Sequence, residues 1–221
     1  MARSSTARRL DEPKPVVATK RPGFGGGEPP APPFRTSAPV VSNARLAVLM
    51  FLGAEAMFFA GLIGAFLVFR LGSPIWPPPF QPRLPIGVTG INTLILLLSA
   101  VTMHLSLKTL RSGQSGKLIR LLGLTAALGA IFLAIQGYEW LRLIHFGLTV
   151  SSSVYGSLFY TLIGFHGLHV VGALIWLVVV LVQAERGRFS REHHTGLVTC
   201  AMYWTFVVAL WPVLYGLVYL Y

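Results

Sequence analysis

Several ionisable side chains of this 221-residue chain stand inside long apolar stretches, where they could do chemistry. Glu55 is the clearest case, because it lies ten residues into the first stretch, within Leu52-Gly-Ala-Glu-Ala-Met-Phe-Phe59. An ionisable group at membrane depth costs about 2.5–3.5 kcal/mol on insertion scales, so it needs a partner or a role. Two interpretations stay open for Glu55: a protonated carboxyl that hydrogen-bonds to a neighbouring helix, and a site that handles protons or contacts lipid.

A second carboxyl, Glu139, has Gln136 three residues before it and Arg142 three residues after it. Residues three apart on a helix share one face, so the three side chains are expected to lie together. The pattern favours a salt bridge between Glu139 and Arg142 near the end of a helix, where the membrane meets water.

Two histidines, His166 and His169, are also three residues apart and could form half of a metal site. No Glu stands three or four residues from either, and one such pair supplies two ligands where three or four are usual. The spacing therefore favours hydrogen bonds between helices or contact with lipid headgroups. Haem ligation is possible in principle, but the sequence gives it no support.

Five apolar blocks of 22 or more residues position these side chains: Leu46–Phe69, Ile86–Leu107, Leu118–Ile144, Tyr155–Val182 and Leu197–Tyr221. A helix of about 20 residues crosses a hydrocarbon core about 30 Å thick. The blocks show no alternation of period two, which excludes the strands of a barrel. The sequence predicts an all-α integral membrane protein with five transmembrane helices in a bundle over residues 43–221.

Composition supports this class, because 54% of the residues are hydrophobic and 11% are charged. Residues 1–42 are basic and rich in Pro and Gly, so we expect a disordered cytoplasmic tail without a secretory signal. Fifteen of the 18 Lys and Arg residues fall in the tail and in the second and fourth loops, and the remaining three are Arg70, Arg83 and Arg142. By the positive-inside rule, the N-terminus lies in the cytoplasm and the C-terminus outside. The net charge of +11 is then a topology signal, and no nucleic-acid partner is expected.

The sequence holds no phosphate-binding loop, nucleophile elbow, catalytic carboxylate pair or dinucleotide fingerprint. Its one cysteine, Cys200, excludes a disulfide within the chain. Small residues suit close helix packing, and they are Gly123 and Gly129, and Gly164, Gly167 and Gly172. These residues predict a packing subunit rather than an enzyme on its own.

Motifs on the predicted helices resemble subunit III of the haem–copper oxidases, in particular cytochrome c oxidase. The resemblance runs from about Arg45 to Tyr221. It rests on Arg45 ten residues before Glu55, on Trp76-Pro-Pro, on Ile91-Asn-Thr to Ser99 and on Gln136-Gly-Tyr-Glu-Trp140. The most specific stretch is Val154-Tyr-Gly-Ser-Leu-Phe with Gly164-Phe-His-Gly-Leu-His-Val-Val-Gly172, followed by His193-His-Thr-Gly196 and Tyr203-Trp204.

The resemblance implies a non-catalytic accessory subunit of a bacterial inner-membrane oxidase that reduces oxygen to water and pumps protons. It implies no cofactor in this chain, bound phospholipid, and haem and copper in subunits I and II, with other respiratory-complex subunits as further partners. Glu55 would be the family's carbodiimide-reactive carboxyl. The side chains expected to serve proton uptake or a lipid cleft are Glu55, Arg45, Glu139, His166 and His169, and those expected at helix-packing or interface contacts are Trp204, Trp211 and Arg142.

One departure from the family's pattern lies in the last helix, where Thr205 and Val208 replace a usual His and Asp.

Three alternative functions remain open for the chain. The first is the equivalent subunit of a quinol oxidase or a nitric oxide reductase. The second is a small ion transporter or channel that uses Glu55, Glu139 and the histidines, although the chain shows no internal repeat. The third is a membrane-bound metalloenzyme, against which the ligand count argues.

Overall fold

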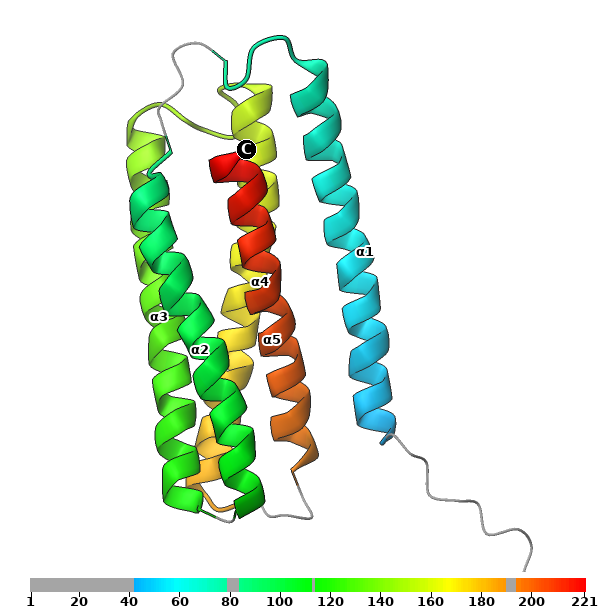
Figure 1. Cartoon of the computed structure of the whole chain (residues 1–221), viewed down its shortest axis with the longest axis vertical. Helices are drawn as coiled ribbons and strands as arrows, with labels where there is room; N and C mark the ends of the chain where they lie inside the picture. Colours follow the sequence, from blue (N-terminus) through cyan, green and yellow to red (C-terminus); the bar gives the residue numbers. More distant parts are fainter. Residues whose placement is uncertain (1–41, 79–83, 113, 190–193) are drawn as a thin grey trace, which may run out of the picture. The chain divides into compact units, whose positions relative to one another are not determined.

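The computed structural model describes residues 42–78, 84–112, 114–189 and 194–221. These residues form five long helices and one short π-helix (Figure 1): α1 Asn43–Gly72, α2 Ile86–Ser112, α3 Ser115–His145, α4 Val154–Glu185, α5 Thr195–Tyr215 and η1 Gly216–Leu220. All five long helices are long and apolar enough to cross a membrane. The predicted all-α class with five transmembrane helices is therefore confirmed. The tail expected over residues 1–42 lies, except for its last residue, outside the described residues.

Two glycines end the third and fourth helices in the same way. Gly147 and Gly187 have φ of 89° and 67°, in the left-handed region that only glycine enters without strain. After α3, the Leu148 N–H bonds to the Leu143 carbonyl, and after α4 the Arg188 N–H bonds to the Gln183 carbonyl. These six-residue closures form Schellman motifs, which satisfy carbonyls that a helix otherwise leaves free at its end. The two motifs therefore end α3 and α4 close to the ends of their apolar sequences.

A stripe of buried polar residues on α2 joins this helix to α3 and α5. Most of its members stand three or four residues from another member, and they are Thr89, Asn92, Thr93, Ser99, Thr102, Ser106 and Thr109. The Thr102 hydroxyl lies 2.7 Å from the Thr125 hydroxyl of α3, and the Asn92 amide donates to the Phe132 carbonyl at 3.1 Å. Hydrogen bonds between helices are one of the forces that hold membrane bundles together, because lipid tails are as apolar as the helices.

The fifth helix lies at the centre of the packing and contacts α1, α2 and α4. Its two indoles are almost fully buried, and each bonds to a hydroxyl of the α2 stripe. Trp204 Nε1 donates to Ser99 Oγ at 3.2 Å, and Trp211 Nε1 donates to Thr93 Oγ1 at 2.9 Å. The α-helix continues through Pro212 and gives way to the π-helix η1 at Gly216.

The first helix is attached to the others far more loosely. Of its 30 residues, the only buried ones are Phe59 and Phe66. It packs against α5 and α4 (Figure 1). Long apolar side chains such as Met50 and Met57 are more than 70% exposed along its outer face. Its attachment therefore depends on a small number of contacts, which run from Phe51 on the Tyr203 ring to Arg70 over the Tyr221 ring.

Gly129 allows the close approach of Trp204 to α3, which predicts a stability effect. A Cβ atom at Gly129 would lie 2.5 Å from the Trp204 ring, whereas one at Gly123 would have no atom within 4 Å. We expect Gly129→Leu to destabilise the bundle by about 1–3 kcal/mol, as overpacking does elsewhere. The loss of stability is measured as a shift of the unfolding midpoint when a denaturing detergent is titrated into protein in a mild detergent. Gly123→Leu on the same helix is the matched control, and an equal loss in both variants would contradict the packing.

Candidate functional site

The main candidate site is a pair of side chains that joins α1 to α4. Glu55 Oε2 lies 2.8 Å from His169 Nε2, although the two residues are 114 positions apart in the chain. On its other side, the His169 ring places Nδ1 at 2.6 Å from the Phe165 carbonyl, one turn earlier on α4. The imidazole is therefore held at both nitrogens, once by its own helix and once by the neighbouring helix.

The two contacts of His169 restrict where protons can lie at the pair. A carbonyl oxygen only accepts, so His169 Nδ1 must carry a hydrogen and donate it to Phe165. The 2.8 Å contact with Glu55 then needs one proton, bound either to the carboxyl or to Nε2. In the first case both groups are neutral, and in the second they are a carboxylate and an imidazolium. Either way the pair has no net charge, which lowers the cost of placing it in hydrocarbon.

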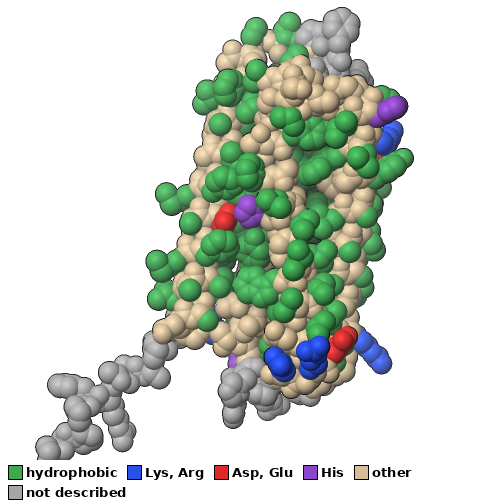
Figure 2. Space-filling view, turned by 180° about the vertical axis from the view of Figure 1, so that it is seen from behind, with side chains coloured by type: hydrophobic (Ala, Val, Ile, Leu, Met, Phe, Trp, Pro, Cys, Tyr) green, Lys and Arg blue, Asp and Glu red, His purple; other side chains and the backbone are tan. Residues whose placement is uncertain are grey.

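Aromatic rings surround the Glu55–His169 pair. The Phe59 ring meets the imidazole edge-on at a centroid distance of 5.0 Å, and Phe58 lies nearly parallel to it at 6.3 Å. Both partners keep a small exposed fraction, 17% for the Glu55 side chain and 15% for His169. Figure 2 shows one acidic side chain beside one histidine at mid-height, among hydrophobic side chains. The pair is thus reached from the side of the bundle, at the depth of hydrocarbon.

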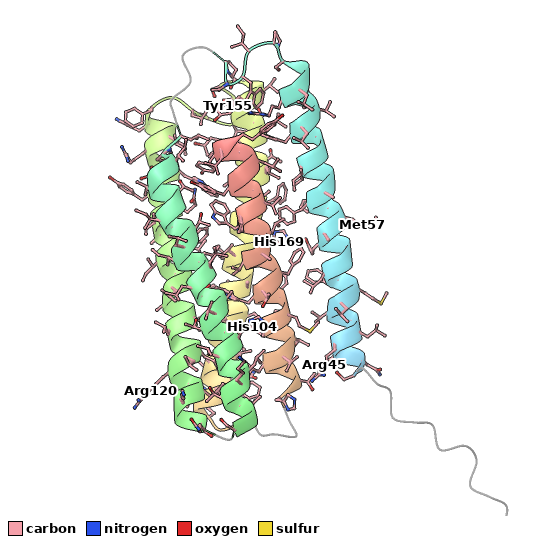
Figure 3. The ribbon with its side chains drawn as sticks, in the orientation of Figure 1. Arg45, Met57, His104, Arg120, Tyr155 and His169 are labelled. Carbon is pink, nitrogen blue, oxygen red and sulfur yellow. The ribbon has the colours of Figure 1, made fainter. Side chains whose placement is uncertain are left out.

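Arg45 does not belong to this pair. It stands ten residues before Glu55 on the same helix, which places it about 15 Å further along the axis. Figure 3 shows Arg45 at the end of α1 and His169 at mid-height. The Arg45 Nε atom is buried and has no hydrogen-bond partner among the described residues. Arg45 and Glu55 therefore lie at different depths of α1, and a shared role in proton uptake or a lipid cleft stays a prediction.

His166 also lies apart from the Glu55–His169 contact. It is 1% exposed, and its ring lies nearly parallel to Trp211 at a centroid distance of 5.0 Å. Within the described ranges, neither of its nitrogens has a hydrogen-bond partner. The two histidines are three residues apart on α4, but His169 contacts Glu55 of α1 and His166 packs on Trp211 of α5.

Glu139 and Arg142 form the ion pair that their spacing predicts, with 3.2 Å between Oε1 and Nη1. The Glu139 side chain is 6% exposed and that of Arg142 is 48% exposed, so the guanidinium reaches out while the carboxylate stays inside. Gln136, one turn away, donates from Nε2 to the Tyr219 hydroxyl of η1 at 3.2 Å. The structure does not join Glu139 to Glu55, which leaves two separate carboxyl sites.

Thr205 and Val208, which depart from the family's pattern in the last helix, make no unusual polar site with the other described residues. Val208 is 2% exposed, and Thr205 Oγ1 bonds back to the Ala201 carbonyl of its own helix at 2.7 Å. Within the described ranges, neither makes a side-chain hydrogen bond to another helix. Among the residues that the structure describes, no three His, Cys, Asp or Glu side chains cluster in a way that could hold a metal ion.

The sequence alone does not reveal the hydrogen-bond partners of Glu55 and Gln136. It did not pair Glu55 with His169, since pairing across 114 positions leaves no trace in spacing. It did not assign the Tyr219 hydroxyl to Gln136. The polar stripe of α2 could have been found, because its period of three to four residues is visible in the sequence.

Together, the fold and the site define a multi-pass helical membrane protein that holds one carboxyl–imidazole pair between two helices. A family model for cytochrome c oxidase subunit III matches residues 35–221, so the chain belongs to that family. The resemblance that the motifs indicated is confirmed. As a member of this family, the chain is part of an oxidase complex and has other subunits as partners.

Curated relatives support the family over most of the chain. Cytochrome c oxidase subunit 3 of Synechocystis is 41% identical over 174 residues, covering 78% of this chain and 73% of the relative. A probable subunit 3 from Nocardia farcinica is 37% identical over 77% of this chain and 84% of the relative. Cytochrome c oxidase subunit 3 of Strongylocentrotus purpuratus is 36% identical over 83% of this chain and 72% of the relative.

The Glu55–His169 contact predicts energetic coupling between the two residues. We expect Glu55→Ala and His169→Ala to be non-additive by about 0.6 kcal/mol and at most about 1.7 kcal/mol, the range of hydrogen bonds between membrane helices. A double-mutant cycle on the unfolding midpoint measures the coupling. The control cycle combines Glu55→Ala with His104→Ala, because among the described residues the hydrogen bond of His104 goes to the Ala100 carbonyl of its own helix. Strict additivity in the first cycle would show that the contact contributes nothing.

Proposed function

We propose that this chain is a non-catalytic accessory subunit of cytochrome c oxidase, a haem–copper enzyme that reduces oxygen to water and pumps protons. In this proposal haem and copper lie in subunits I and II, and the present chain braces subunit I, binds phospholipid and supports proton uptake. The names of the relatives and the family model support the assembly, and the Glu55–His169 pair supports the role in proton handling.

The contact of 2.8 Å between Glu55 Oε2 and His169 Nε2 carries the proposal. A carboxyl and an imidazole that hold one proton between them can exchange it over a 2.8 Å contact without a change in net charge. Both side chains keep a small exposed fraction, so a second donor or acceptor in lipid or in a neighbouring subunit can reach them. This is the chemistry that an accessory site for proton uptake requires.

The loosely attached first helix supports the proposal of lipid contact. Only two of its side chains are buried, so most of its apolar surface is free for acyl chains or for another subunit. At its end, Arg45 has a buried Nε without a partner in the described part of the chain. A guanidinium near the membrane surface suits the phosphate of a phospholipid.

We propose that the N-terminal end of α1 lies on the cytoplasmic side. The helix order puts the α2–α3 and α4–α5 connections at that same end. Lys108 and Lys117 lie in the adjoining turns of α2 and α3, and Arg186 and Arg188 lie in the α4–α5 connection. Figure 2 shows Lys and Arg side chains gathered at one end of the bundle. Arg70 and Arg142 mark the opposite end, so the charge asymmetry follows the positive-inside rule.

This orientation predicts which loops a membrane-impermeant maleimide reaches in intact cells. We expect Ser151→Cys, in the α3–α4 connection, to be labelled without permeabilisation. Gln114→Cys, in the α2–α3 connection, should be labelled only after the membrane is opened. The native Cys200 is buried in the bundle and serves as the internal blank. Labelling in the reverse order would contradict the orientation.

The accessory role predicts what accompanies the chain in mild detergent. We expect a tag on this chain to recover haem- and copper-bearing subunits, with absorption spectra that identify the haem and mass spectrometry that identifies the partners. The untagged strain is the control for non-specific recovery. A stable, colourless chain recovered alone would contradict the proposal, and ion flux through that chain in liposomes would then support the transporter alternative.

A further inference from the structure

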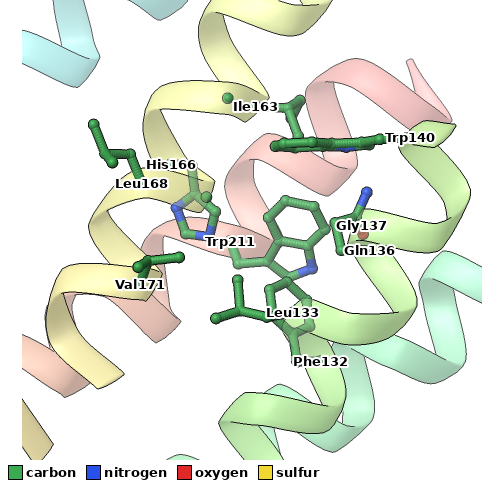
Figure 4. A pocket seen from close by; sticks show the side chains of 12 residues that line it. Phe132, Leu133, Gln136, Gly137, Trp140, Ile163, His166, Leu168, Val171 and Trp211 are labelled. Atoms are coloured by element: carbon green, nitrogen blue, oxygen red, sulfur yellow. The ribbon is translucent and has the colours of Figure 1, made fainter. Parts of the chain in front are cut away.

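A pocket of about 400 Å³ opens between α3 and α4, on residues that the Glu55–His169 pair does not use. Its twelve lining residues include Gln136, Trp140 and His166, and Figure 4 shows them with Trp211 around the opening. The volume falls in the usual range for small-molecule sites, about 300–1,000 Å³. The pocket belongs entirely to this chain, so a ligand there does not depend on the partners proposed above.

Three polar side chains in the pocket wall have hydrogen-bonding atoms without partners. These atoms are Gln136 Oε1, Trp140 Nε1 and both ring nitrogens of His166, and each has no hydrogen-bond partner among the described residues. Gln136 and His166 are 5% and 1% exposed. An unpaired buried polar group costs about 1–3 kcal/mol, so three together on one pocket point to a ligand. The terminal torsions of Gln and His are broad, so a small turn suffices for each to reach it.

The chemistry of the wall restricts the ligand. The indole of Trp140 donates, the amide oxygen of Gln136 accepts, and a neutral imidazole does both. No Lys, Arg, Asp or Glu lines the pocket, so a charged headgroup would find no counter-charge. The remaining lining is apolar or aromatic, so a plain acyl chain would fill the space but leave the polar atoms unpaired.

The depth of the pocket agrees with an uncharged ligand. His166 stands twelve residues from the start of α4, about 18 Å along the axis, which is inside hydrocarbon for a helix of 32 residues. Trp140 stands five residues from the end of α3, nearer the membrane surface. Leu168 lines the pocket and is 63% exposed on the outer surface of the bundle, so the pocket lies beside the side surface of α4.

Two glycines create the space. Gly137 and Gly164 both line the pocket, and a Cβ atom at either would meet no atom within 4 Å. Gly167 has the opposite role, because a Cβ there would lie 2.9 Å from the Trp140 ring. Glycine at this position lets the indole lie against α4 and close one side of the pocket.

We propose that this pocket binds a neutral, membrane-soluble ring compound that carries a hydroxyl or carbonyl group, the chemistry of a quinone or quinol headgroup. A ring carbonyl accepts from Trp140 Nε1, and a ring hydroxyl donates to Gln136 Oε1 or to His166. The apolar and aromatic wall holds the ring, and the ligand's tail leaves through the lateral opening into the bilayer.

The test uses the tagged chain, with its co-purified subunits, in lipid nanodiscs and a photoreactive dimethoxybenzoquinone with a decyl tail. We expect saturable labelling of peptides within 132–140 and 163–171, competed by unlabelled decylbenzoquinone and not by phosphatidylglycerol. Gly164→Leu, which fills the pocket, should reduce labelling at least tenfold. Gly172→Leu on the same helix also has open space but lies outside the pocket, so it should leave labelling unchanged.

A milder variant keeps the proposal testable if Gly164→Leu does not fold. Trp140→Phe removes one donor and keeps most of the ring, so the probe's affinity should fall about two- to tenfold, the effect of one hydrogen bond. Labelling that does not saturate, or that Gly164→Leu leaves unchanged, would overturn the proposal. Equal competition by phosphatidylglycerol would also overturn it and would assign the pocket to an acyl chain.

Discussion

In hydrocarbon a buried polar side chain has no water to bond to, so its partner comes from the protein or from a bound molecule, and this constraint organises the bundle. The α2 stripe shows the principle most clearly. Ser99 and Thr93 accept from the two indoles of α5, and Thr102 meets Thr125 of α3. Because each bond needs a defined distance, the polar pairs set which helices are neighbours, and the apolar residues fill the space between them.

The first helix follows the same constraint with a different result. It has little buried surface of its own, so the Glu55–His169 contact and the Phe59 ring fix its position against α4. A contact of this kind joins two helices and also leaves a proton at the junction. Under the proposed role in proton handling, the pair that attaches α1 is also the pair that carries the proton.

Much of the fold could be predicted from the sequence, because span length and apolar composition are local properties. The five helices and the Glu139–Arg142 pair follow from length and from a spacing of three residues. The partner of Glu55 could not be predicted, since it depends on how α1 and α4 are placed in space. The sequence grouped Arg45 and His166 with Glu55, whereas the structure gives each a separate environment. Helical periodicity shows which residues share a face, and only the tertiary arrangement shows what that face meets.

Removal of the chain from the assembled oxidase tests the central claim, that this subunit supports the reaction without carrying it. Oxygen consumption would be followed over many turnovers in the complex with and without the chain, together with its haem and copper content. If the subunit supports the reaction without carrying it, the depleted complex keeps its full metal content and initial activity, and then loses proton uptake and activity as turnover continues. Loss of metal or of all initial activity with the chain would contradict it.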